Sequence, residues 1–322
     1  MTTRLIAGCG YVGMQVAAKW LKSGDKVFAF TRDSTRSDEL SKLGIRPILW
    51  NWIPGSLPID QDNWSELRKC MATSEPLTLL VAVSHAPQPD IDPRETHTRG
   101  LVNLKHALLA ADSRNTVDWI YLSTTGVFGN TSPGEWVDEK SKVGPNRPGS
   151  IAAWEAEQWL ANNLESNRVV ILRPAGIYGP GRVPRWQSIR DQMPLKADPD
   201  SYLNLIHVAD LASIVVCVSN QKTIGSLYCV SDGQPVLRRE YYEFISQLGN
   251  WPRPVFETLE SNSTSNTTSR SDGNKRISNN CIQNELSYPF LFPSYREGLR
   301  SLLEGLGKTQ QMALKMAVKQ MR

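Results

Sequence analysis

A run of glycines near the amino terminus has the spacing of a phosphate-binding turn. The run reads Gly8-Cys9-Gly10-Tyr11-Val12-Gly13. In a turn from strand to helix, the first glycine permits the tight turn, the second lets the backbone approach a pyrophosphate, and the third lets the helix pack close to the sheet. The helix that follows presents free N–H groups and the positive end of its dipole to the phosphates. The run therefore predicts a dinucleotide site, with a glycine-rich turn that binds nothing as the alternative.

The residues after the second predicted strand bear on which dinucleotide would bind. This stretch reads Thr31-Arg32-Asp33-Ser34-Thr35-Arg36. An acidic residue at this place usually holds the ribose 2′-hydroxyl of NAD, whereas arginine suits the 2′-phosphate of NADP, because a guanidinium binds phosphate through paired hydrogen bonds. Arg32 and Arg36 therefore favour NADP over NAD. In the alternative, Asp33 takes the ribose and the preference is reversed.

The order of the segments predicts the sheet and helices that must position these residues. Short apolar runs at residues 4–7, 26–31, 45–50, 77–83, 119–123 and 169–172 are separated by helix-length segments, of which residues 11–22 have apolar side chains at helical spacing. Strands that alternate with helices predict an α/β fold with a Rossmann-like, doubly wound parallel sheet. Residues 204–207 and 226–230 are expected to be further strands, on either side of a helix over residues 209–218.

The middle and the end of the chain depart from this alternation. Residues 174–199 are rich in Pro, Gly and Arg and show no clean period, which indicates loops and short elements outside the sheet. We therefore expect a nucleotide-binding domain of residues 1–173 plus 203–232, a small C-terminal substrate-binding domain of residues 174–202 plus 233–302, and a helical tail of residues 303–322. The polar tract at residues 260–274 predicts a mobile surface insertion, and a helical pattern runs over residues 295–321.

Four segments add a resemblance to a known family. Residues 121–129, YLSTTGVFG, are similar to the strand and loop that carry the active-site Ser or Thr of the extended short-chain dehydrogenases/reductases, the NAD-dependent epimerase/dehydratase group. Residues 172–182, LRPAGIYGPGR, resemble the signature of that family at the nicotinamide end of the cofactor. Residues 204–212 and 228–232 resemble its IHVxDLA segment and its final sheet strand. The segments occur in family order, so the resemblance covers nearly the whole chain.

The resemblance implies a catalytic hydroxyl, but the chain departs from the family at two other catalytic positions. Thr124 matches the family's Ser or Thr. The family's general base is a Tyr whose pKa is lowered by a Lys four residues later on the same helix face. Gly149 and Ala153 stand at those two positions, and no Tyr of the sequence is followed by Lys four residues later. The chain therefore resembles the atypical members that keep the cofactor site and lose this pair.

Several other side chains are candidates for acid–base or anion-binding groups. Glu155 and Glu157 lie on the helix that would have carried the Tyr, and we interpret both as part of a solvated helix face. We interpret His85 as a polar loop residue beside the cofactor, and His207 as a hydrogen-bonded structural histidine near a helix cap. Three arginines of predicted loops would either clamp an anionic substrate or be solvated: Arg147, Arg182 and Arg185.

The glycine turn, the second strand and the resembling segments together give the expected cofactor contacts. These are Gly8, Cys9, Gly10, Tyr11, Val12, Gly13, Thr31, Arg32, Arg36, Ser84, Ser123, Pro174 and Ile177. NADP is expected in preference to NAD, and no metal site is expected. The resemblance implies an oxidoreductase or an epimerase/dehydratase-like enzyme that acts on a small molecule, with a nucleotide sugar as the family-level substrate. The alternatives are a non-catalytic NADP-binding redox sensor and an assembly or scaffold protein.

Composition limits the class of protein further. Of the 322 residues, 40% are hydrophobic and 21% charged, as in ordinary globular proteins. The 36 Lys and Arg against 32 Asp and Glu give a net charge of +4, which favours anionic ligands but is too small to indicate a nucleic-acid partner. The five cysteines form no C-x-x-C pair, which disfavours a disulfide framework and a structural zinc site. The sequence has no signal-peptide pattern and no long apolar run, so we expect a cytoplasmic protein with no membrane span. Assembly as a homodimer is left open.

Overall fold

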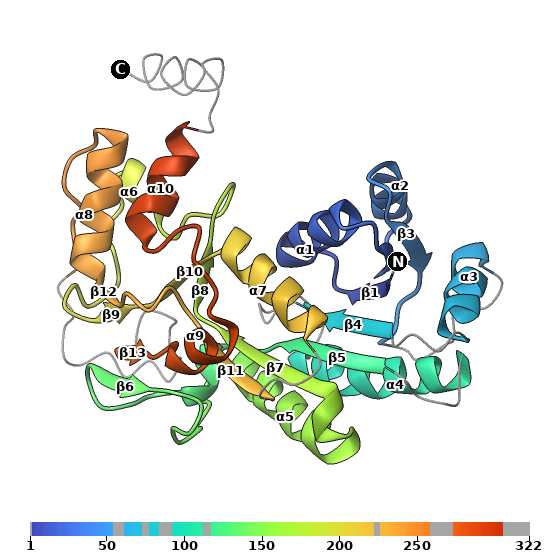
Figure 1. Cartoon of the computed structure of the whole chain (residues 1–322). Coiled ribbons are helices and arrows are strands. Elements are labelled where there is room, and N and C mark those ends of the chain that lie inside the picture. The colour runs from blue at the N-terminus through green and yellow to red at the C-terminus, as the bar shows by residue number, and fades with distance from the viewer. Residues whose placement is uncertain are drawn as a thin grey trace.

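A seven-stranded parallel sheet lies at the centre of the molecule. The computed structural model describes residues 2–53, 61–72, 77–83, 92–111, 117–221, 226–257 and 273–304. In the sheet the strand order is β11-β7-β5-β4-β1-β2-β3, and every neighbouring pair is parallel (Figure 1). The strands are β1 (Thr3–Ala7), β2 (Lys26–Thr31), β3 (Arg46–Leu49), β4 (Leu77–Val81), β5 (Val117–Leu122), β7 (Val169–Pro174) and β11 (Leu227–Val230). This arrangement confirms the predicted doubly wound α/β fold.

The strand order reverses beside β1. From β1 the chain passes outward to β2 and β3, returns to β4 on the other side of β1, and continues outward to β5, β7 and β11. The connections that follow β1 and β4 therefore diverge, which opens a crevice at the carboxyl ends of these two strands. Ligands of doubly wound folds bind in such a crevice, so this edge of the sheet is where a site is expected.

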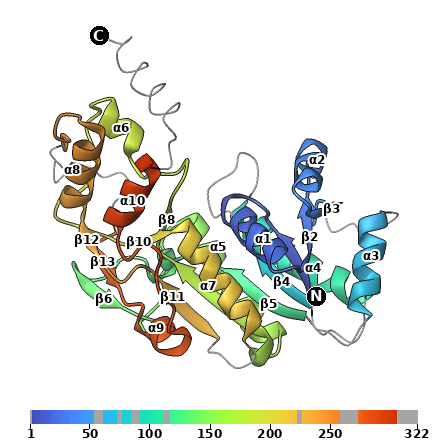
Figure 2. The ribbon, with the colours of Figure 1, turned by 45° about the horizontal axis from the view of Figure 1, so that its top comes forward.

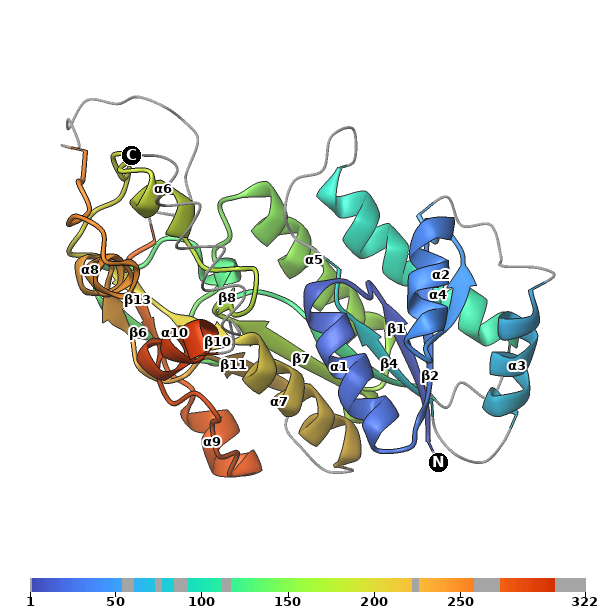
Figure 3. The ribbon, with the colours of Figure 1, turned by 90° about the horizontal axis from the view of Figure 1, so that it is seen from above.

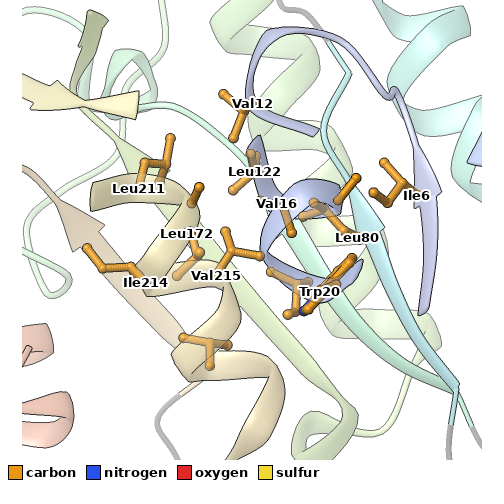
Figure 4. Close-up of a cluster of buried hydrophobic side chains, with 14 of the residues drawn as sticks. Ile6, Val12, Val16, Trp20, Leu80, Leu122, Leu172, Leu211, Ile214 and Val215 are labelled. Atoms are coloured by element: carbon orange, nitrogen blue, oxygen red, sulfur yellow. The ribbon is translucent and has the colours of Figure 1, made fainter. Parts of the chain in front are cut away.

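The helices α1 (Tyr11–Lys22) and α7 (Val208–Asn220) cover one face of the sheet (Figure 3). Val16 and Trp20 of α1 lie four residues apart and pack with Val215 of α7 in one buried cluster (Figure 4). Ile6 of β1 and Leu122 of β5 belong to the same cluster. Since each fully buried apolar side chain contributes roughly 1.5–3 kcal/mol, this packing holds the amino-terminal end of α1, and the glycine turn before it, at the crevice.

The helices α3 (Asp62–Met71), α4 (Gly100–Ala111) and α5 (Pro148–Asn163) cover the other face. The alternation of side chains along β1 reflects these two layers, because Leu5 and Ala7 belong to the cluster under α3, α4 and α5 whereas Ile6 belongs to the cluster under α1 and α7. Both faces of the strands are therefore buried, which explains why their sequences are apolar at nearly every position. The helix α2 (Ser34–Lys42) follows β2.

A smaller group of elements gathers at one end of the sheet (Figure 2). Its strands are β8 (Gly176–Tyr178), β9 (Tyr202–Leu203), β10 (Leu205–His207) and β12 (Val236–Leu237), and its helices are α6 (Trp186–Arg190), α8 (Arg238–Gly249), α9 (Asn280–Leu286) and α10 (Tyr295–Glu304). β10 pairs with β8, so the strand predicted at residues 204–207 exists but lies outside the large sheet. Tyr178, Tyr241 and Tyr295 pack in a separate hydrophobic cluster of this group.

Two short strands that are far apart in the sequence form a parallel pair. β6 (Glu135–Val137) pairs with β13 (Lys275–Ile277), and Lys275 lies opposite Glu135. The sequence patterns predicted neither strand. Their pairing brings the segment that begins at Gly273 to the loop that follows β5.

Two of the sequence predictions fall largely on residues outside the described ranges. The predicted insertion at residues 260–274 overlaps the described chain only at Gly273 and Asn274, and the predicted tail at 303–322 overlaps it only at 303–304. α10 is the described part of the helix predicted over residues 295–321. Within the described ranges no helix has both the length and the apolar character needed to cross a bilayer.

Candidate cofactor and substrate site

A cavity of ≈ 1720 Å³ lies at the carboxyl ends of the central strands and extends to the small group of elements. Its cofactor half is lined by the glycine turn, the end of β2 and the residues after β4. Its substrate half is lined by the start of α5, the loop after β8, β9, and the residues Arg238, Tyr242 and Lys275. Ligand cavities usually measure roughly 300–1,000 Å³, so this one has room for a dinucleotide and a second molecule.

The glycine turn has the geometry of a phosphate cradle. Gly8 has a φ of +92°, and a Cβ at this position would lie 2.7 Å from the carbonyl oxygen of Ala82. A Cβ on Gly13 would lie 2.7 Å from the carbonyl oxygen of Gly8, so this glycine permits the close approach of α1 to the turn. No atom lies within 4 Å of the place of a Cβ on Gly10. The cavity is therefore open to a phosphate at Gly10, and the amino terminus of α1, which begins at the next residue, faces it without an acidic residue in its first turn.

Two arginines line the cavity beside this turn. Arg36 donates a hydrogen bond from Nη2 to the carbonyl oxygen of Cys9 at 3.1 Å and forms an ion pair with Glu39 at 2.6 Å. Arg32 is exposed and also lines the cavity. Asp33 caps α2 instead, since its Oδ1 accepts hydrogen bonds from the backbone N–H groups of residues 35 and 36 at 2.8 and 3.3 Å. These residues fit the ribose and phosphate end of a dinucleotide.

Thr124 lines the cavity just after the end of β5. Its Oγ1 accepts a hydrogen bond from the backbone N–H of Gly126 at 3.0 Å and so caps the 3-10 turn η2 (Thr125–Phe128). This contact uses a lone pair of the hydroxyl and leaves its proton available for another acceptor in the cavity. At the two positions of the family's Tyr and Lys, Gly149 lines the cavity and Ala153 is fully buried.

The prediction that Glu157 lies on a solvated helix face is wrong. Its carboxylate is buried and accepts three contacts from Arg173 of β7, at 3.1 and 3.2 Å from Nε and at 2.6 Å from Nη2. The hydroxyl of Ser123 also donates to it. A buried carboxylate needs such partners, and here they tie α5 to the ends of β5 and β7 under the cavity floor. The prediction holds for Glu155, which is partly exposed and pairs with Arg94 at 2.9 Å.

Most of the residues predicted to contact the cofactor line this single cavity. They are Gly8, Cys9, Gly10, Tyr11, Val12, Thr31, Arg32, Arg36, Ser123, Pro174 and Ile177, with Thr124 beside them. Gly13 packs beneath the turn, and Ser84 and His85 lie outside the described residues. Arg147, Arg182 and Arg185 line the cavity as well. The guanidinium of Arg182 stands 5.6 Å from the ring centroid of Tyr11, so it lies where the two halves of the cavity meet.

His207 has the structural role that the sequence predicted. It is the N-cap residue of α7, and its Nδ1 accepts a hydrogen bond from the backbone N–H of Ala209 at 3.2 Å. The rings of Tyr178 and Phe292 pack against it, with centroids 5.1 and 3.9 Å away. Burial lowers the pKa of His207 to about 4, so the imidazole is neutral near pH 7.

Two cavity residues were not identified from the sequence. Arg238 begins α8 and Lys275 begins β13, and both are buried. Burial, together with the charges of Arg147 and Arg238, lowers the pKa of Lys275 to about 8. No local sequence pattern marks Lys275, because the strand that carries it has only three residues.

Comparison with known proteins supports one family. A sequence model described as the NAD dependent epimerase/dehydratase family matches residues 5–228. The chain is 25% identical over 270 residues to a 4-hydroxy-2-methyl-3-oxo-4-farnesyl-3,4-dihydroquinoline-1-oxide ketoreductase of Stigmatella aurantiaca, which covers 78% of this chain and 76% of that one. It is also 25% identical over 293 residues to Protein YeeZ of Escherichia coli strain K12, which covers 89% of this chain and 95% of that one.

Solved structures agree with the fold. A dTDP-glucose 4,6-dehydratase of Bacillus anthracis, solved in complex with NAD, superposes with a TM-score of 0.73 over 98% of this chain and 100% of that chain. The two are 16% identical, so this likeness concerns the fold alone.

Proposed function

The chain belongs to the NAD dependent epimerase/dehydratase family, and on that premise we propose that it is an NADP-preferring oxidoreductase acting on a small molecule. The observation that carries the proposal is the cavity itself, which joins the glycine turn to the hydroxyl of Thr124. In this proposal the cofactor lies along the cavity with its pyrophosphate at Gly10. The small group of elements, within residues 174–202, 233–257 and 273–302, lines the substrate half.

Two arginines support the preference for NADP. Arg32 and Arg36 line the cavity where the 2′-phosphate of the ribose would lie, and a guanidinium binds phosphate through charge-assisted hydrogen bonds. Asp33 caps α2 through Oδ1 alone, which leaves Oδ2 as an acceptor for a ribose hydroxyl, so the preference for NADP rests on the two arginines.

Thr124 is the proposed catalytic residue at the reactive end. Its Oγ1 accepts a hydrogen bond from the N–H of Gly126, which leaves the hydroxyl proton for an oxygen of the substrate. When bound, the nicotinamide supplies or accepts a hydride at a substrate carbon. The Thr124 hydroxyl would then stabilise the charge that develops on the attached oxygen. The buried pair of Glu157 and Arg173 keeps the floor of this end rigid.

The proposal includes the absence of the usual Tyr and Lys. Gly149 leaves space in the cavity wall where the family's phenol would stand, and Ala153 carries no charge. The proton must therefore pass through another group or water. This departure also keeps a second function open, that of an NADP-binding protein without turnover.

The experiment that tests the proposal is turnover with a panel of small ketones, aldehydes and their alcohols. The purified chain is mixed with NADPH or NADP, and the absorbance of the reduced nicotinamide is followed. We expect turnover with at least one compound, lowered about 10- to 1,000-fold in Thr124→Val because one hydrogen bond to the developing charge is lost. Thr131→Val, in the loop before β6 and outside the cavity, serves as the matched control.

The outcomes separate the two functions. NADPH binding without turnover of any compound would favour the non-catalytic protein. Turnover that is equal in Thr124→Val and in Thr131→Val would remove Thr124 from the mechanism.

A further inference from the structure

Three cationic side chains from distant parts of the sequence line the substrate half of the cavity. Arg147 is the N-cap residue of α5, Arg238 is the first residue of α8, and Lys275 is the first residue of β13. The family resemblance assigned no role to Arg238 or Lys275. The pairing of β13 with β6 brings Lys275 to the loop after β5, and so to the same side of the cavity as Arg147.

Contacts with two glycines place the three charges close together. The Nη2 of Arg238 donates to the carbonyl oxygen of Gly273 at 3.3 Å, and a Cβ on Gly273 would lie 3.8 Å from the Nζ of Lys275. Lys275 in turn donates to the carbonyl oxygen of Gly129 at 3.2 Å. Gly129 is the C-cap residue of the turn η2. The guanidinium of Arg147 lies against the same turn, at Gly126.

Arg147 also borders the reactive end of the cavity. A Cβ on Gly126 would lie 3.2 Å from the Nη2 of Arg147 and 3.3 Å from the Oγ1 of Thr124. The guanidinium and the hydroxyl therefore flank the same small volume, and the absence of a side chain on Gly126 leaves room for both.

This arrangement is electrostatically costly unless an anion joins it. Arg238 and Lys275 are 6% and 8% exposed, and their described partners are neutral oxygens. Arg147 and Arg238 stand at the amino termini of helices, where the helix dipole favours anions and disfavours cations. No Asp or Glu is among the described residues that line the cavity. The charges of Arg238 and Lys275 are thus not balanced by an acidic residue among the described residues of the cavity wall.

We propose that Arg147, Arg238 and Lys275 form a binding site for an oxyanion, a phosphate or carboxylate group, that the substrate carries. The proposal rests on the proposed function, because the site is the substrate half of the same cavity. Guanidinium groups and helix amino termini both bind oxyanions through N–H donors, and the Lys275 ammonium adds a point charge. Since Arg147 borders Thr124, the anionic group lies close to the oxygen of the substrate that Thr124 contacts.

The test is titration calorimetry of the full chain with inorganic phosphate and, separately, with acetate, in chloride buffers of matched ionic strength. We expect wild type to bind at least one of them, and Lys275→Met to weaken that binding about 10- to 100-fold, as for loss of a hydrogen bond to a charged group. Lys196→Met removes the same charge from an exposed side chain outside the cavity and should leave the Kd unchanged. Phosphate bound in the cofactor half would be weakened by Arg32→Ala and not by Lys275→Met, which separates that binding from the site proposed here.

Two further variants keep the test decisive if Lys275→Met does not fold. Lys275→Arg retains the charge and should retain binding, whereas Arg238→Gln removes a charge from α8 and should lose it. Binding of phosphate alone indicates a phosphate ester as substrate, and binding of acetate alone indicates a carboxylic acid. Binding of neither, or a Kd that is the same in wild type, Lys275→Met and Arg238→Gln, would overturn the proposal.

A separate titration of the chain with NADPH and then NADH is an independent readout. If NADPH binds and no oxyanion does, the oxyanion site is refuted and the proposed function stands. If the oxyanion binds through Lys275 and neither NADPH nor NADH binds, the oxyanion site stands and the proposed function is refuted.

Discussion

Replacing Glu157 by Gln removes the charge that balances Arg173 while the size of the side chain is kept. The two side chains are 3% and 2% exposed, and the shortest contact between them is 2.6 Å. The guanidinium of Arg173 also lies 5.1 Å from the ring centroid of Phe128 and 5.8 Å from that of Trp154, so its other described neighbours include two aromatic rings. After the substitution, a full positive charge stays buried among neutral groups.

The expected cost follows from this burial. Breaking a buried ion pair by removing one partner costs about 3–5 kcal/mol, because the remaining charge is desolvated and uncompensated. For 322 residues, an unfolding entropy of roughly 2.1 cal/mol/K per residue means that 1 kcal/mol lowers Tm by about 1.5 °C, so Glu157→Gln should lower Tm by about 4–8 °C. The double variant Glu157→Gln with Arg173→Met should recover much of that loss, since no buried charge is left without a partner.

The assay is thermal and urea unfolding followed by circular dichroism. Glu155→Gln is the matched control, two residues earlier on the same helix. Its ion pair with Arg94 is partly exposed and should contribute about 0–1 kcal/mol. The reasoning is refuted if Glu157→Gln costs no more stability than Glu155→Gln, or if the double variant is less stable than Glu157→Gln.

The other predictions concern the two ends of the cavity. Arg32→Ala should weaken NADPH binding about 10- to 100-fold and NADH binding little, because only NADPH carries the 2′-phosphate; calorimetry with each nucleotide checks this, and equal losses would remove Arg32 from that role. For Lys275, burial with Arg147 and Arg238 facing its ammonium group gives a pKa of about 8 in the folded chain, below the ordinary 10.5. The native chain then binds fewer protons than the unfolded chain between these values, so the free energy of unfolding of wild type, relative to Lys275→Met, should rise over that window by up to roughly 3 kcal/mol. Below pH 8 the buried ammonium group of Lys275 destabilises the folded chain in full. Urea unfolding of both chains across this pH range checks the prediction, and a difference in free energy of unfolding that does not change with pH would contradict the assignment.

The sheet and the glycine turn could be predicted because their signals are local. A buried parallel strand is a short apolar run, and the turn from β1 to α1 is marked by three glycines, of which Gly8 and Gly13 are required by the backbone geometry. The capping role of His207 could be inferred for the same reason, since the start of α7 is visible in the sequence beside it.

Glu157 and Lys275 could not be placed because their surroundings come from elsewhere in the chain. A Glu on a helix is usually solvated, and only the position of β7 beneath α5 gives this one Arg173 as a partner. Lys275 reaches the cavity through the pairing of β13 with β6, whose strands are too short to show a pattern in the sequence. The gathering of Arg147, Arg238 and Lys275 is likewise a product of tertiary structure.

The most direct test of the account is a titration of the purified chain with NADPH and then NADH, followed by reduced-nicotinamide fluorescence, in wild type and in Gly10→Ala. The place of a Cβ on Gly10 is open, so the variant should fold normally while its methyl group occupies the approach to the pyrophosphate. Gly144→Ala, at a position that is equally open but outside the cavity, is the control. We expect micromolar binding with NADPH preferred in wild type and in Gly144→Ala, and binding weakened about 10-fold or more in Gly10→Ala at unchanged Tm. Absence of binding to wild type at millimolar nucleotide, or equal binding by Gly10→Ala, would contradict this expectation.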